Sequence, residues 1–297
     1  MIKYSEAVAK ALGDKSPIVA LESTIITHGL PRPKNLEVAL EVEQIVIEAG
    51  VTPATIAIID GQINIGLEPD QLTRIANDEN ILKASIRDLA VISTQKKSAA
   101  TTVAATSHIA NMAGISLFAT GGLGGVHREA WQSWDESADL LALANTPVLI
   151  VCSGAKSILD VSATLERLET LSVPILGYKT NKFPGFYLTD SGFELEHRVD
   201  TAREIAQIWR ARGDVAINKS ALIVANPVSN QMERALHDQL LFDGLSKAKI
   251  DGVVGKAVTP YLLDYFHTNS KGESLRVNIE IIKANAALAA QIAVALR

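Results

Sequence analysis

The sequence contains a single cysteine, Cys152, among its 297 residues. One cysteine cannot form an intramolecular disulfide or a cysteine-rich metal site, so nothing indicates an oxidising compartment. An excess of positive charge is also lacking, because the formal net charge is -5. This balance disfavours a protein whose main role is to grip a nucleic-acid backbone. A small anionic substrate is still compatible with it, since one basic pocket can coexist with an acidic surface.

Long apolar runs are scarce as well, and we expect none of them to span a bilayer. The N-terminus lacks the apolar core of a signal peptide, so we expect a cytoplasmic protein. Hydrophobic residues make up 47% of the chain, which is enough for a sizeable core. We find no repeat and no low-complexity linker. We therefore predict one domain over residues 1–297, although the length alone also fits two.

Short apolar runs rich in β-branched residues predict six buried strands, at 18–21, 55–59, 116–119, 148–152, 174–178 and 221–225. Helical segments separate them, such as 35–49, where Leu36, Leu40 and Ile47 fall near one face. This alternation predicts an α/β fold of three α/β/α layers with a mostly parallel central sheet. The alanine-rich stretch 274–297 predicts a long helix that packs on the sheet or on another subunit.

Ligands of such sheets bind at the carboxyl ends of the strands, where we look for chemistry. Glu22 follows the first strand and is an exposed loop carboxylate, an arginine partner, or a general acid or base. Lys156 follows the strand at 148–152, with the small Gly154 and Ala155 beside it. It is either a solvated surface lysine or an amine nucleophile.

Three further segments are candidates for binding. The glycine-rich run 120–128 can approach a phosphate or sugar closely, but a structural tight turn explains it equally well. Asp135 either caps a helix or, with Asp139 one turn later, faces a hard cation that keeps its waters. The third candidate combines the basic Lys83 and Arg87 with residues 101–104, which offer hydroxyls and amides at a helix start. Together they fit a phosphate-binding site, although each of them alone is ordinary surface chemistry.

Several motifs become specific when they are taken together and in order. They are ALESTIITHG at 20–29, PATIAII at 53–59, ATTVA at 100–104, FATGGLGGVHR at 118–128, NT at 145–146, GAKSILD at 154–160, VANP at 224–227, and Ser274-Leu275 with Asn278-Ile279. Over nearly the whole chain, this order resembles the pseudouridine-5'-phosphate glycosidase family. The resemblance implies an enzyme that cleaves the C–C bond between uracil and ribose 5-phosphate.

The resemblance also assigns residues. Glu22 falls on the family's proton donor and Lys156 on its nucleophile, which forms an imine with the sugar. Asp135 falls on the ligand of a manganese ion, and the family implies a homotrimer. The resemblance implies that eight residues bind the substrate: Lys83, Thr102, Val103, His127, Ser137, Ala138, Asp139 and Asn278.

Two departures from the family pattern affect loop shape rather than chemistry. Asp60 stands where a glycine is expected, and residues 97–99 replace a more glycine-rich segment. Two other functions stay open. One is a related C- or N-glycoside lyase that acts on another phosphosugar, and the other is a non-catalytic phosphosugar-binding protein.

Overall fold

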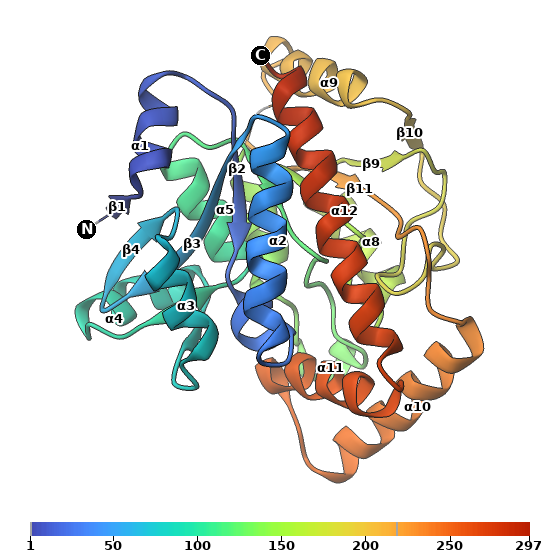
Figure 1. Ribbon diagram of the computed structural model, residues 1–297. Helices are drawn as coiled ribbons and strands as arrows, with labels where there is room; N and C mark the ends of the chain where they lie inside the picture. Colours follow the sequence, from blue (N-terminus) through green and yellow to red (C-terminus); the bar gives the residue numbers. More distant parts are fainter. Residues whose placement is uncertain (1, 218) are drawn as a thin grey trace.

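The computed structural model describes residues 2–217 and 219–297, whose strands form one sheet of eleven strands (Figure 1). The strands are β1 (Ile2–Tyr4), β2 (Ile18–Glu22), β3 (Thr52–Ile59), β4 (Gln62–Ile65), β5 (Leu82–Ala84), β6 (Ala99–Thr101), β7 (Leu117–Ala119), β8 (Leu149–Cys152), β9 (Ile175–Tyr178), β10 (His197–Val199) and β11 (Leu222–Ala225). Their order is β1-β4-β3-β2-β7-β8-β11-β9-β10, with β6 beside β3 and β5 beside β6. Only the pairs β3·β4 and β3·β6 are antiparallel among these described strands. The predicted mostly parallel sheet is confirmed, and all six predicted strands are present.

Helices cover both faces of this sheet. They are α1 (Glu6–Gly13), α2 (Lys34–Glu48), α3 (Pro69–Asn77), α4 (Leu89–Thr94), α5 (Val103–Met112), α6 (Ala130–Ser133), α7 (Ala138–Asn145), α8 (Val161–Thr170), α9 (Ala202–Asp214), α10 (Arg234–Ile250), α11 (Val258–Asn269) and α12 (Glu273–Ala295). One core lies under α2, α9 and α12, and the other under α1, α5, α7 and α8. This arrangement confirms the three α/β/α layers. That the chain is a single domain stays a prediction.

Helix α2 confirms the predicted helix but not its predicted buried face. Leu40 and Ile47 are 49% and 51% exposed, whereas Val38, Val42 and Val46 are buried against the sheet. The valines recur every four residues and therefore form the apolar stripe of a helix that packs on one side. Leu40 and Ile47 do fall near one face, as expected, but this face is half open to solvent, because the position on the helix and not the bulk of the side chain decides burial.

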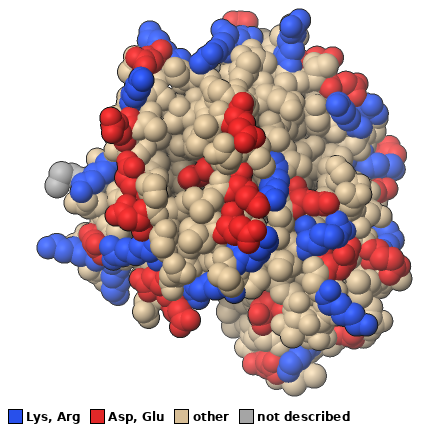
Figure 2. Space-filling model, viewed as in Figure 1, with Lys and Arg blue, Asp and Glu red and all other residues tan. Residues whose placement is uncertain are grey.

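Helix α12 confirms the long helix predicted at 274–297 and its packing on the sheet, but the expectation that no run has the length and apolarity of a membrane span was wrong. By length and composition alone it could cross a membrane, yet 61% of its apolar window is buried inside the protein. It packs against α2 and α9 and against strands β2, β7 and β8, so it is a core helix of this fold. Figure 2 shows acidic and basic side chains mixed on the face formed by α2 and α12. Among them, Lys283 of α12 pairs with Glu41 of α2.

Helices α10 and α11 form a separate projection beyond the carboxyl ends of the strands (Figure 1). They pack against each other, and their apolar side chains share a third core with α12 and the loop that contains Phe186 and Tyr187. The carboxyl ends of the strands therefore face helix α11.

Candidate active site

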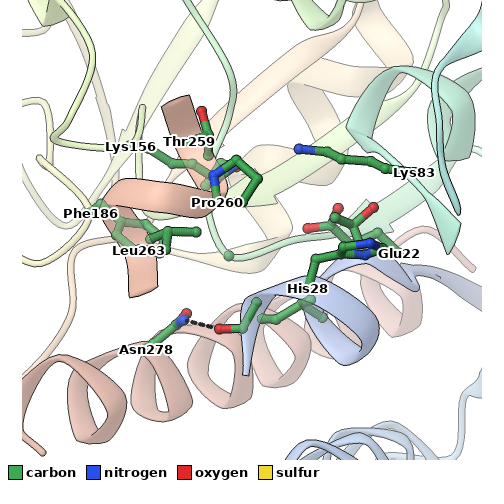
Figure 3. Close-up of a pocket in the computed structure, with 14 residues that line it drawn as sticks. Glu22, His28, Lys83, Lys156, Phe186, Thr259, Pro260, Leu263 and Asn278 are labelled. Carbon is green, nitrogen blue, oxygen red and sulfur yellow. Dashed lines mark hydrogen bonds between the residues drawn. The ribbon is translucent and has the colours of Figure 1, made fainter. Parts of the chain in front are cut away.

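A pocket lies at the carboxyl ends of the central strands (Figure 3). Parallel strands end at the same edge of a sheet, which explains why distant segments meet there. Four of the predicted site residues line it together: Glu22, Lys83, Lys156 and Asn278. The other lining residues are Thr24, Ile25, His28, Gly29, Gly121, Gly122, Phe186, Thr259, Pro260 and Leu263.

Glu22 is the last residue of β2 and is only 8% exposed, so it is not an exposed loop carboxylate. Burial raises the pKa of its carboxyl group, while the charge of Lys156 and a hydrogen bond from Thr120 oppose this rise. The Thr120 hydroxyl donates that bond to Glu22 Oε1. A carboxyl group with a raised pKa keeps its proton to higher pH, which suits a general acid.

Lys156 lies in the loop after β8 and points into the pocket (Figure 3). Its Nζ donates a hydrogen bond to the carbonyl of Gly122 at 2.8 Å. Gly154 makes this loop possible, because its φ is +75° and a Cβ there would lie 1.9 Å from the Pro184 carbonyl oxygen. The half-buried amine is therefore held beside the glycine-rich loop rather than extended into solvent.

Asn285 of α12 supports the same loop from below. Its fully buried side chain donates to the Thr120 carbonyl at 2.8 Å and accepts from Asn226 Nδ2 at 3.0 Å. The carbonyl that Asn285 holds and the hydroxyl that reaches Glu22 belong to the same threonine. Asn285 thus positions Thr120 against the buried carboxyl group, a role that the sequence analysis missed.

Asp139 holds two loops together. Its Oδ1 accepts the amide of Ala104 and its Oδ2 accepts the amide of Gly124, both at 2.9 Å. Ser137 caps helix α7, so the predicted cap at Asp135 is wrong. A Cβ at Gly124 would lie 2.3 Å from Ser137 Oγ, which explains a glycine at this close approach. Ser137 and Asp139, with Ala138 between them, therefore fix the glycine-rich loop to the start of α5.

Asp135 and His127 form a pair near the pocket. Asp135 Oδ2 lies 3.8 Å from His127 Nδ1, and the Asp135 side chain is partly open to solvent. Burial lowers the pKa of His127, Asp135 opposes this, and the charges of Lys83 and Lys156 lower it further. Within the described residues, no group of three or more His, Cys, Asp or Glu side chains could enclose a metal. A hard ion that keeps most of its waters is the kind that one open carboxylate fits.

The Lys83 end of the pocket carries positive charge. Lys83 belongs to β5. Burial is the main cause that lowers the pKa of His28, and the positive charge of Lys83 lowers it further. Thr102 caps the adjacent helix α5, and its hydroxyl accepts from the Ala105 amide. Asp139 and Thr102 already accept the amides of Ala104 and Ala105, so the Val103 amide is the first-turn donor of α5 that can meet an anion. Arg87 is exposed and lies 3.9 Å from Asp88, in agreement with the surface interpretation.

The departure at Asp60 has a local explanation. Its φ is +50°, a conformation in which glycine is the usual residue and aspartate is among the better substitutes. Its carboxylate binds both terminal nitrogens of Arg74, at 2.6 and 2.8 Å. Ser98, in the second departure, accepts the Asp60 amide through its hydroxyl. The two departures thus form one surface turn.

Several pocket residues were not predicted. Thr24 and His28 lie within the 20–29 motif and could have been found there. Phe186, Thr259 and Leu263 lie in segments without a recognisable motif, and only the packing of α11 over the strand ends brings them to the site.

The fold and the pocket define a class of α/β protein that presents a buried acid, a lysine amine and a cationic end at one sheet edge. The family model described as "Indigoidine synthase A like protein" matches residues 7–295. The pseudouridine-5'-phosphate glycosidases of Salinispora tropica and Frankia alni are 55% and 51% identical to the chain over 296 residues. These matches cover 99% of this chain and 91% and 82% of the relatives. The chain belongs to the pseudouridine-5'-phosphate glycosidase family.

Two solved structures share the fold. The prealnumycin C-glycosynthase AlnA, in complex with ribulose 5-phosphate, has a TM-score of 0.91 and 34% identity and covers 100% of this chain and 97% of its own. An indigoidine synthase A (IdgA)-like protein from Thermotoga maritima has a TM-score of 0.89 and 33% identity, with 99% and 96% covered. Both agree with the three-layer fold predicted from the sequence.

Proposed function

We propose that this chain is a pseudouridine-5'-phosphate glycosidase, which splits its substrate into uracil and ribose 5-phosphate. The observation that carries the proposal is the meeting of Glu22 and Lys156 in one buried pocket with Lys83 at its cationic end. Curated relatives of the family bear this name, and AlnA binds a pentose phosphate. A related lyase for another phosphosugar would use the same groups, so base recognition separates the two.

The bond to be broken explains the choice of a lysine. Ordinary glycosidases use two carboxyl groups, because their leaving oxygen or nitrogen, once protonated, accepts the electron pair of the broken bond easily. A uracil carbon cannot leave directly as a carbanion at reasonable cost. An amine that adds to the sugar offers an alternative, since its nitrogen lone pair can stabilise the carbon left behind as an imine.

The proposed sequence begins at Glu22, which donates its proton to the ring oxygen as the ribose opens. Lys156 Nζ then adds to the anomeric carbon and loses a proton to the Glu22 carboxylate. Transfer of this proton to the uracil carbon allows the C–C bond to break, and its electrons stay with uracil. The sugar remains as an imine on Lys156, and water releases ribose 5-phosphate and restores the amine.

The cationic end is the proposed seat of the phosphate. Lys83 can neutralise its charge, and the Thr102 hydroxyl and the Val103 amide at the start of α5 can hydrogen-bond its oxygens. Asn278 lies on the opposite wall, where its amide donates to the Gly29 carbonyl at 3.3 Å. Within the described chain, its buried Oδ1 has no partner and can accept an N–H of the base.

We also propose Asp135 as the ligand of one Mn²⁺ ion, with His127 beside it. When bound, such an ion supplies positive charge and ordered waters near the sugar. The residues of the chain itself perform the proton and covalent steps above. Ser137, Ala138 and Asp139 hold the glycine-rich loop in place beside Asp135.

Incubation with pseudouridine 5'-phosphate and Mn²⁺ is expected to release uracil, measured by absorbance, and a chelator is expected to suppress the reaction. Asp135→Asn should raise the Mn²⁺ concentration needed for half activity. Loss of an outer-shell partner alone costs about 10- to 100-fold in metal affinity, so loss of a ligand should cost at least as much. Glu136→Gln is the matched control, because Glu136 lies next to Asp135 but pairs with Arg167 at 3.0 Å.

The outcomes separate the competing functions. Full activity in the presence of the chelator would refute the proposed requirement for Mn²⁺. Release of a different base from another phosphosugar, with none from pseudouridine 5'-phosphate, would favour a related lyase. Binding without any product would favour a non-catalytic phosphosugar-binding protein.

We further propose a cytoplasmic homotrimer, on the strength of the family resemblance. Trp131 and Trp134 support an interface, because they are 79% and 85% exposed and large apolar side chains rarely stay in water without a partner. Light scattering is expected to give a mass near three times that of the 31.8 kDa chain. A monomeric mass would refute the trimer.

A further inference from the structure

The pocket has two chemically different ends (Figure 3). Lys83, Glu22 and His28 lie toward one end, and Phe186 and Leu263 lie toward the other, with Asn278 beneath. Lys156 approaches from the upper wall, near Pro260 of α11. A substrate with an anionic group and an apolar group would therefore be oriented by the pocket alone.

Phe186 is held at the apolar end in a conformation that its sequence does not favour. Its φ is +61°, in the left-handed region where a bulky residue is an outlier. Such strain persists only where the surroundings impose it, and it concentrates at functional sites. Here the Phe186 amide donates to the Ser153 carbonyl at 3.0 Å, which ties it to the loop that bears Lys156.

The ring of Phe186 lies directly against the glycine-rich loop. A Cβ at Gly122 would lie 2.6 Å from its Cδ2, so glycine at this position lets the ring approach, and a Cβ at Gly121 would be in ordinary contact with its Cε2 at 3.5 Å. The carbonyl of Gly122 also accepts the hydrogen bond from Lys156 Nζ. One residue, Gly122, thus contacts both the aromatic ring and the amine.

Helix α11 fixes this ring through a second aromatic. Tyr187 packs edge-on against Phe186 with ring centroids 4.7 Å apart, and it stacks on Phe266 of α11 at 5.3 Å and 15°. The same helix supplies Pro260 and Leu263 to the pocket. Because Tyr187 and the glycine-rich loop brace Phe186, the residue is only 3% exposed, and the ring lines the pocket in one fixed position.

We propose that Phe186 is the wall on which the base of the substrate stacks, and that α11 is the element that selects a flat base. This inference rests on the proposed function. The base leaves from the carbon that Lys156 attacks, so it must lie beside the amine, where the Phe186 ring lies. Aromatic faces bind planar rings by stacking, and a pyrimidine is such a ring.

Calorimetry with pseudouridine 5'-phosphate and with ribose 5-phosphate tests this wall when every variant, and the wild-type Phe186 reference, also carries Lys156→Ala, which prevents turnover and imine formation. Phe186→Ala is expected to weaken binding of the nucleotide about tenfold or more, since stacking of one base is worth about that much. Binding of ribose 5-phosphate, which has no base, should stay within about twofold of wild type. Phe186→Leu, which keeps bulk but not the ring, should resemble Phe186→Ala, and Phe186→Tyr should resemble wild type.

Phe242→Ala is the matched control, because Phe242 is exposed on α10 and lies outside the pocket lining. It should change neither dissociation constant. Equal losses for both ligands in Phe186→Ala, or wild-type nucleotide affinity in Phe186→Leu, would overturn the wall. A wrong reaction would instead appear as an absence of uracil release in wild type, whatever the two affinities show.

Discussion

Lys156→Ala is expected to abolish uracil release while substrate binding stays measurable. The amine is the only group of the proposed mechanism that can carry the sugar covalently, and loss of a covalent nucleophile costs on the order of 10³-fold or more. Binding should survive because the Lys83 end and the Phe186 end of the pocket are unchanged. Rates of uracil release, together with the nucleotide dissociation constant, separate these two effects.

Reductive trapping tests directly for the covalent bond between Lys156 and the sugar. Borohydride with ribose 5-phosphate should attach the sugar to Lys156 in wild type, and mass spectrometry should find no such adduct in Lys156→Ala. Lys156→Arg should also be inactive, since it keeps the charge but not the nucleophile. Lys247→Ala, which removes an exposed lysine paired with Asp251 on α10, should trap normally. Near-normal turnover in Lys156→Ala would refute the covalent mechanism.

The positions of Glu22 and Lys156 could be predicted because each immediately follows a buried apolar run. Such runs form the central strands β2 and β8, and parallel strands end at a common edge. The short β5 and β6 could not be predicted, because neither contains a run of β-branched apolar residues and both gain stability from pairing with β3 or with each other. The predictions therefore succeeded where local pattern and burial coincide.

The apolar end of the pocket could not be predicted for a different reason. Phe186 lies in an irregular loop, and its place depends on its contact with Gly122 and on its neighbour Tyr187, which stacks on Phe266 far away in the sequence. Asn285 likewise resembles any polar residue of an alanine-rich helix. Its role follows only from its partners Thr120 and Asn226, which lie in the loops after β7 and β11. Long-range packing, rather than local preference, decides these roles.

Glu22→Gln is expected to lower turnover by about 10²- to 10⁴-fold, the usual contribution of a general acid. Glutamine has the same shape but cannot donate a carboxyl proton. The fold should not suffer, because burial disfavours the charged form of Glu22 and glutamine is neutral. Steady-state kinetics should show the loss in kcat, and thermal unfolding should show a Tm at or above that of wild type.

The proposed role of Glu22 as a general acid also predicts the direction in which activity changes with pH. Glu22 must hold its proton to act, so activity should fall as pH rises through the pKa of Glu22, which burial has raised. Thr120→Val removes a hydrogen bond that favours the ionised carboxylate, so the pKa should rise further and the alkaline limb should move to higher pH. Thr120→Ser keeps the hydroxyl and should leave the limb in place. An unmoved limb in Thr120→Val, or retained turnover in Glu22→Gln, would assign the proton to another group.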